Sequence, residues 1–130
     1  MRKLLIDIAA VLLVLHGLIH LMGTTVYLQF GQIQGLPYKT TLLDARWDLG
    51  ENGIRVFGAL WVLPALGFVL SAMALLGSWA SWQPLLIGVT ILSLALTVLD
   101  WSAAYAGAIF NVVILGIVLL GSRLTEWLGR

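Results

Sequence analysis

The sequence predicts an all-α integral membrane protein, a four-helix bundle with a long outer loop between helices 1 and 2. Of the 130 residues, 61% are hydrophobic and 10% are charged, and the mean hydropathy is +1.03. Soluble domains are about half apolar and a quarter charged. Four separate apolar segments approach the roughly 20 residues that a helix needs to cross the hydrocarbon core. We therefore expect a single transmembrane domain over residues 1–130.

The first span is expected at about residues 4–23. The basic start Arg2-Lys3 followed by an apolar run is similar to a signal peptide. The run continues through His16 to Met22, however, and no small-residue cleavage pattern interrupts it. This pattern indicates a retained membrane span.

The polar stretch that follows, residues 24–53, must lie outside the hydrocarbon as the outer loop, and its acidic residues are expected to be solvated. Within it, Thr41 followed three residues later by Asp44 resembles a helix N-cap, and Gly50 resembles a stop signal. These signals predict a short amphipathic helix over 42–49 at the membrane interface.

The second span is expected at about 54–76, with a kink at Pro64 that frees the carbonyl of Leu60. A short uncharged connection with two tryptophans leads to the third span at about 84–101, so the second and third helices should be antiparallel neighbours. The fourth span is expected at about 103–120.

The balance of basic residues predicts a multi-pass protein of the cell membrane with both termini in the cytoplasm. Cytoplasmic segments carry an excess of Lys and Arg. The terminal segments contain Arg2, Lys3, Arg123 and Arg130, and the loop region contains Lys39, Arg46 and Arg55.

Ionisable residues inside a span are costly and therefore indicate a functional site or a specific contact. His16 and His20 are four residues apart and so share one helix face, the spacing by which a helix offers two imidazoles to one metal or one carboxylate. Asp100 ends a polar seam of the third span formed by Thr90, Ser93 and Thr97. Asn111 lies on a stripe of small residues in the fourth span, with Ala103 and Gly107.

These groups fall at one level of the bundle when the helical rise is counted from each span boundary. His16 lies about 18 Å and His20 about 24 Å above the inner boundary, and Asp100 also lies at about 24 Å. Asn111 lies about 12 Å below the outer boundary. Together with Arg55, which can snorkel toward them, they predict an outward-facing polar pocket.

Structural interpretations stand beside this hypothesis. Each imidazole can simply bond a neighbouring helix, Asp100 can be a wetted helix end, and Asn111 can be an interhelical hydrogen bond. The hydroxyls of the seam can bond their own i−4 carbonyls.

The segment His16-Gly17-Leu18-Ile19-His20-Leu21-Met22-Gly23 resembles the HGxIHxxG-type first helix of a group of small, uncharacterised bacterial four-span membrane proteins. Gly107 and Asn111 are similar to the GxxxN pattern of their last helix. The resemblance implies the span layout and supplies no substrate. In that group an acidic residue is expected just before the last glycine motif, whereas here Ser102–Ala106 intervenes after Asp100.

The leading hypothesis is a membrane-embedded binding module whose pocket, built from His16, His20, Asp100 and Asn111, holds a divalent metal, haem or a small ligand. The two histidines are the candidate metal ligands. Alternatives are a small oligomeric proton-coupled transporter or channel, an intramembrane acid–base enzyme acting on a lipophilic substrate, and an accessory subunit of a larger membrane complex.

Several classes are unsupported. The chain has no cysteine, so thiolate chemistry and Cys-ligated metals are excluded. The net charge of +1 offers no basic surface for nucleic acid. No phosphate-binding loop, dinucleotide fingerprint, HExxH or GxSxG motif occurs. The expected partners are the lipid bilayer and further copies or subunits.

Overall fold

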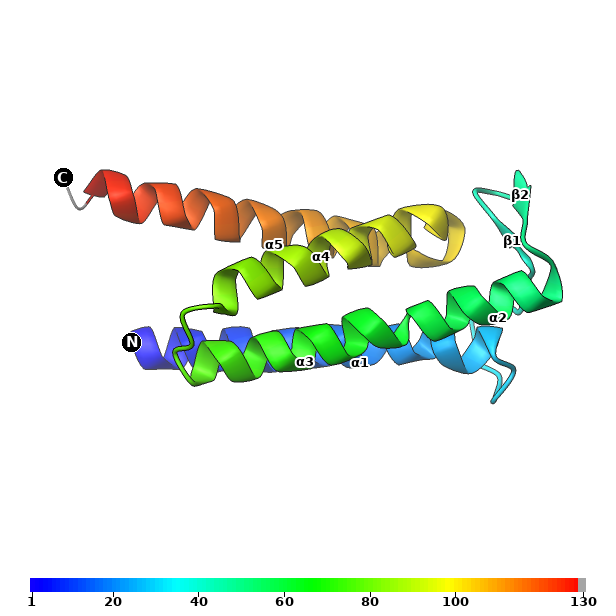
Figure 1. Ribbon diagram of the computed structural model, residues 1–130, viewed down its shortest axis with the longest axis horizontal. Coiled ribbons are helices and arrows are strands. Elements are labelled where there is room, and N and C mark those ends of the chain that lie inside the picture. Colours follow the sequence, from blue (N-terminus) through cyan, green and yellow to red (C-terminus); the bar gives the residue numbers. More distant parts are fainter. Residues whose placement is uncertain (129–130) are drawn as a thin grey trace.

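The computed structural model describes the backbone of residues 1–128 and the side chains of residues 1–121 and 123, so Arg130 lies outside the described residues. It is a bundle of four long helices, in which α1 packs against α3 and α4 packs against α5 (Figure 1). By length and composition, all four could cross a membrane. The all-α class and the four long helices are confirmed. The helices are α1 (Arg2–Tyr27), α2 (Gly50–Leu60) continued by α3 (Val62–Leu76), α4 (Trp82–Leu99) and α5 (Trp101–Leu128).

The second long helix is interrupted at Trp61, three residues before Pro64. Proline has no N–H to donate to the carbonyl four residues earlier, which is that of Leu60. Helix α2 ends at Leu60 and α3 resumes at Val62. The structure thus interrupts this helix where the sequence predicts a kink.

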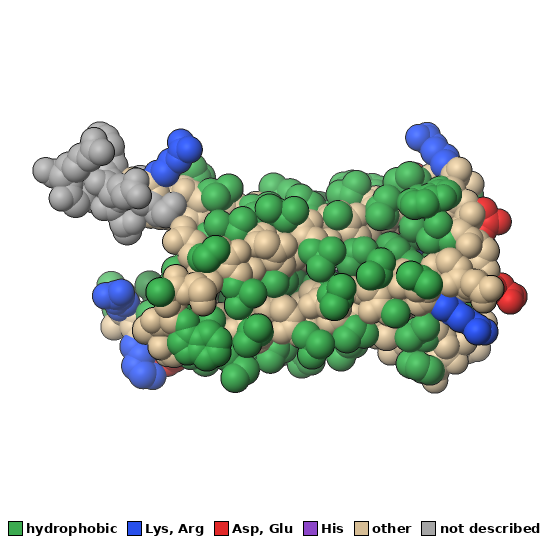
Figure 2. All heavy atoms as spheres, in the orientation of Figure 1, with side chains coloured by type: hydrophobic (Ala, Val, Ile, Leu, Met, Phe, Trp, Pro, Cys, Tyr) green, Lys and Arg blue, Asp and Glu red, His purple; other side chains and the backbone are tan. Residues whose placement is uncertain are grey.

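The long faces of the bundle are apolar and its ends are charged. Hydrophobic side chains cover the length of the face shown in Figure 2, and Lys and Arg side chains lie near its two ends. Large hydrophobic residues are exposed on each long helix, for example Leu15, Leu66, Ile91 and Ile117. The start of α1 and the far end of α5 lie at the same end of the molecule (Figure 1), opposite the loop.

The outer loop contains a small hairpin, so the predicted helix over 42–49 is wrong. Strand β1 (Thr41–Leu42) pairs antiparallel with β2 (Trp47–Asp48). The connecting residues 43–45 all have positive φ angles of 54–65°, which no right-handed helix contains. Tertiary contacts override the capping pattern, because Leu42 is buried and the amide of Leu43 donates to the carbonyl of Leu99, 3.0 Å away.

Asp48, rather than Asp44, supports the start of α2. Its Oδ1 accepts hydrogen bonds from the Gly50 amide and the Thr40 hydroxyl, both at 2.9 Å. These two donors hold the pKa of the Asp48 carboxyl below its usual value, with the amide of Gly50 contributing most. The loop therefore has a defined structure and leads directly into α2.

Close packing of α1 on α3 depends on a glycine. A Cβ atom added to Gly17 would lie 2.9 Å from both the carbonyl oxygen of Ala65 and the Cβ of Phe68. The two backbones therefore approach more closely than any other residue would allow. This contact places His16 and His20, on either side of Gly17 in sequence, beside α3.

Candidate functional site

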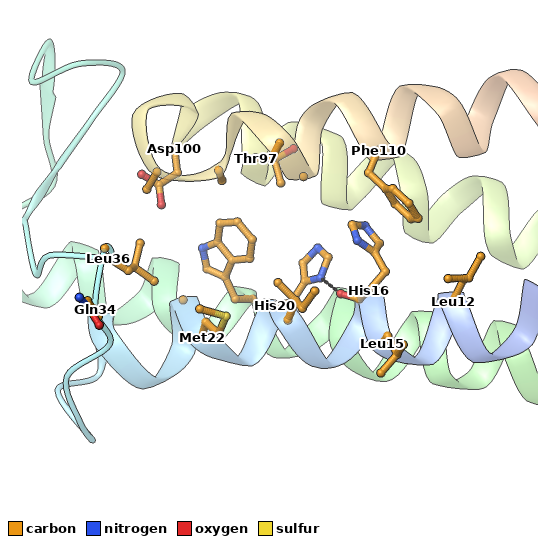
Figure 3. Close-up of a pocket in the computed structure, with 18 residues that line it drawn as sticks. Leu12, Leu15, His16, His20, Met22, Gln34, Leu36, Thr97, Asp100 and Phe110 are labelled. Atoms are coloured by element: carbon orange, nitrogen blue, oxygen red, sulfur yellow. Dashed lines mark hydrogen bonds between the residues drawn. The ribbon is translucent and has the colours of Figure 1, made fainter.

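A cavity of about 480 Å³ lies between α1 and α5, with the outer loop at one end. Its rim consists of exposed apolar residues of both helices, among them Leu12, Ile19 and Phe110. Its depth is polar, because His16, His20, Thr97 and Asp100 also line it. Figure 3 shows both imidazoles directed from α1 toward α4 and α5. The arrangement is an apolar entrance leading to buried polar groups.

Four buried side chains from three helices form one continuous hydrogen-bond chain. His16 Nε2 lies 2.9 Å from Asn111 Oδ1, and Asn111 Nδ2 lies 2.8 Å from Ser93 Oγ. Ser93 Oγ lies 2.6 Å from His20 Nε2, and His20 Nδ1 lies 2.8 Å from the backbone carbonyl oxygen of His16. The chain therefore starts and ends at the same residue of α1.

The backbone carbonyl of His16 fixes which atoms donate and which accept along this hydrogen-bond chain. The His16 carbonyl can only accept, so Nδ1 of His20 carries a proton, and in a neutral imidazole Nε2 must then accept. The single hydroxyl proton of Ser93 goes to that nitrogen, which leaves Ser93 Oγ to accept from the amide of Asn111. Asn111 Oδ1 then faces His16 and accepts from its Nε2–H.

The Nδ1 atom of His16 is consequently an unprotonated acceptor. Among the described residues none donates a hydrogen bond to it, and His16 is one of the residues that line the cavity. Neighbouring aromatic rings fix the imidazole, with centroids of Phe68 and Phe110 at 4.8 and 4.6 Å. A rigid neutral imidazole with one free lone pair can accept a hydrogen bond or a proton.

Trp61 supplies a second unusual polar group beside the same cavity. Its ring centroid lies 5.3 Å from that of His20. The indole Nε1–H is buried and finds no acceptor within the described part of the chain. Most buried donors are paired, so this indole N–H is an exception.

Asp100 is the buried centre of a separate cluster at the loop end of the cavity. Tyr27 donates its hydroxyl hydrogen to Oδ2, and the ammonium of Lys39 lies 2.7 Å from Oδ1. The Lys39 contact is an ion pair that lies outside hydrogen-bond geometry, and the same ammonium donates to the Ser102 hydroxyl at 2.8 Å. We call Tyr27, Lys39 and Asp100 the loop latch, because Lys39 ties the loop, and Tyr27 the end of α1, to the junction of α4 and α5.

The structure brings together three of the five predicted site residues in one network, namely His16, His20 and Asn111. Asp100 lines the same cavity, but its carboxylate is bound to Tyr27 and Lys39 rather than to an imidazole. Arg55 is exposed on α2 and does not line the cavity. The three network residues lie at one level, as the helical rise predicts, whereas Asp100 at the same predicted level bonds neither imidazole.

The two histidines do not form a ready-made metal site. Their rings meet edge to face, with centroids 4.9 Å apart and planes at 88°, and both nitrogens of His20 are engaged. No group of three or more His, Asp or Glu residues suited to a metal occurs among the described residues. A metal bound here would have to break the hydrogen-bond chain or use His16 Nδ1 alone.

The hydroxyl seam divides in two. Thr90 and Thr97 donate to the carbonyls of Leu86 and Ser93, four residues earlier on the same helix, which is the structural interpretation. Ser93 instead joins α1 to α5 at the centre of the chain. The sequence signal for Ser93 was its position between the two threonines, on the face of α4 that also carries Asp100.

Three contributors were not singled out from the sequence: Trp61, Tyr27 and Lys39. Tyr27 and Trp61 look like ordinary aromatic residues near span ends. Lys39 lies 61 positions from Asp100 in sequence, and only the path of the loop brings them together. Comparison with protein-family models, curated proteins and solved structures finds no match for this chain.

Proposed function

We propose that this protein is an integral, multi-pass membrane protein that binds a small amphiphilic organic molecule in the cavity between α1 and α5. The observation that carries the proposal is the cavity itself, with an exposed apolar rim and a depth of neutral, hydrogen-bonded polar groups. Pockets of 300–1,000 Å³ with mostly apolar walls and a few placed polar groups are typical of small-molecule sites.

The apolar exterior supports membrane insertion. Side chains such as Leu15 and Ile117, 52% and 68% exposed, would be covered by lipid. The rim residues Leu12 and Ile19 belong to the same exposed face. A ligand would then enter sideways from the bilayer. The start of α1 and the end of α5 lie at the same end of the bundle, and basic residues lie near that end. The proposal therefore places both termini in the cytoplasm.

An organic ligand fits the donor set better than a metal or haem. Thiolate ligands are absent from the sequence, and each nitrogen of His20 already has a partner. Within the hydrogen-bond chain, the lone pair of His16 Nδ1 is the one that has no partner among the described residues. One imidazole lone pair in an apolar pocket suits recognition of a polar group on a lipophile.

The test is to fill the cavity with a large side chain and to measure whether a bound lipophile is lost. Ala106 is exposed and lines the cavity, whereas Ala95 is exposed on α4 and does not. We expect protein purified in lipid nanodiscs to release a co-purified lipophile on solvent extraction, seen by mass spectrometry. Ala106→Trp should remove it and the matched control Ala95→Trp should retain it. No lipophile enriched above bulk lipid, or equal amounts in both variants, would contradict the proposal.

Acid–base catalysis on the bound molecule is the second candidate, and the free lone pair of His16 Nδ1 favours it. The loop latch already engages Asp100, so His16 would act without a carboxylate partner. Mass spectrometry of the same extracts distinguishes the two functions. A binding protein returns an added lipophile unchanged, whereas an enzyme returns a product that His16→Gln does not form.

A further inference from the structure

We infer that the ligand is an uncharged lipophile bearing a hydrogen-bond donor, of the alcohol or phenol class, and that His16 Nδ1 accepts the hydrogen of its hydroxyl group. This inference rests on the proposed function and specifies the ligand of the same cavity. It follows from the direction of the hydrogen-bond chain and from the charge of the cavity lining.

The hydrogen-bond chain leaves one acceptor, His16 Nδ1, without a hydrogen-bond donor among the described residues. His16 lines the cavity and is 7% exposed, its Nε2–H is committed to Asn111, and no described side chain donates to its Nδ1. A ligand with a hydroxyl or N–H group satisfies that lone pair. A ligand with only carbonyl or ether oxygens places two acceptors against each other, which costs the hydrogen bond in a site with little water.

The charge of the lining argues for a neutral ligand. Asp100 is the one carboxylate among the lining residues, and it is 2% exposed and paired with Lys39. No Lys or Arg of the described part of the chain lines the cavity. A carboxylate, phosphate or ammonium headgroup placed near His16 would therefore lose its hydration with no opposite charge to replace it.

The position of His16 sets where the hydroxyl lies. The residues beside it on the exposed side of α1 are apolar, with Leu12 and Ile19 one turn away in either direction, and Phe110 packs on its ring. The hydroxyl end of the molecule thus lies at the depth of the cavity, and its apolar body lies along the rim toward lipid.

The experiment uses two matched probes, bromoundecanol and bromoundecyl methyl ether, with the protein in nanodiscs. The ether keeps the oxygen acceptor and lacks the donor. Trp61 lines the cavity, so bound bromine should quench its fluorescence. The signal is the saturable quenching that unbrominated undecanol displaces and that Trp61→Phe removes.

We expect the parent to bind the alcohol about tenfold more tightly than the ether, the effect of one hydrogen bond in a buried site. The decisive variant combines His16→Leu with Asn111→Leu, because a glutamine at position 16 would bring a new acceptor, its Oε1, to the cavity. The double variant lacks both the Nδ1 lone pair and the Asn111 Oδ1 that accepts from His16. It should bind the two probes equally.

The outcomes separate the two levels of the argument. Equal affinity of the parent for both probes, or an alcohol preference that persists when His16→Leu and Asn111→Leu are combined, would overturn the assignment of the ligand class and leave the binding function standing. Absence of saturable quenching with either probe would overturn the binding function as well.

Discussion

His20 Nε2 accepts a 2.6 Å hydrogen bond from the hydroxyl of Ser93, and this contact joins α1 to α4 in the centre of the bundle. Asn111 of α5 donates to the same hydroxyl oxygen at 2.8 Å. One small side chain therefore links three helices. In a bundle that lipid surrounds, apolar contacts alone give helices little preference for each other, so such a bond helps to define their arrangement.

Ser93→Ala should destabilise the bundle by about 1–2 kcal/mol, because it leaves His20 Nε2 without a donor and removes one of the two acceptors of the Asn111 amide nitrogen. Ser71→Ala is the matched control. Ser71 is equally buried, but its hydroxyl donates only to the carbonyl of Gly67 in its own helix. Thermal or denaturant unfolding in mild detergent measures both. Equal stability losses would show that the Ser93 contact has no special weight.

Gly17→Ala should weaken the α1–α3 contact by about 1–3 kcal/mol, since its new methyl group would lie 2.9 Å from the Ala65 carbonyl oxygen. Gly88→Ala, where a Cβ meets nothing within 4 Å, should be neutral or slightly stabilising. The same unfolding assay compares the two. A harmless Gly17→Ala would mean that the helices do not pack this closely.

The loop latch should control the order of the outer loop. Lys39→Met leaves the buried carboxylate of Asp100 without its cation, and because the Lys39 side chain is 23% exposed the cost should lie below the roughly 3–5 kcal/mol of a fully buried pair. We expect faster hydrogen exchange in residues 28–49, with α1 and α3 protected as before. Lys39→Arg should preserve the protection. Unchanged loop exchange in Lys39→Met would contradict a role for this ion pair.

The purified protein should be colourless and free of stoichiometric metal, because the two histidines bond Asn111, Ser93 and a backbone carbonyl rather than converging on one ion. The visible absorption spectrum and elemental analysis of the parent and of the double variant His16→Ala with His20→Ala test this. A chromophore or bound metal that the double variant loses would instead support the metal or haem interpretation.

Much of the fold could be predicted because its signals are local. Apolar length gives the four long helices, and the missing N–H of Pro64 gives the break before α3. The residues His16, His20 and Asn111 could be grouped by counting helical rise, since that rise is nearly constant. The loop hairpin could not be predicted, because burial of Leu42 and the bond from Leu43 to Leu99 depend on the assembled bundle.

The partner of Asp100 shows the same limit for the site. Counting placed Asp100 level with His20, but it gave no information on the rotation of α4 or the path of the loop. Those two features bring Tyr27 and Lys39 to the carboxylate. Similarly, only the assembled hydrogen-bond chain shows that His16 Nδ1 is the open acceptor, because that conclusion needs all four members in place.

Access to the cavity from lipid is the central claim, and a spin label tests it most directly. The chain has no cysteine, so Ala106→Cys can be labelled at one site on the cavity wall, with Ala95→Cys as the lipid-facing control. In nanodiscs, we predict that dissolved oxygen relaxes both labels strongly and that a water-soluble nickel complex barely reaches either. Strong relaxation of the Ala106 label by the nickel complex would contradict the account and indicate a water-filled pathway, as a transporter or channel requires.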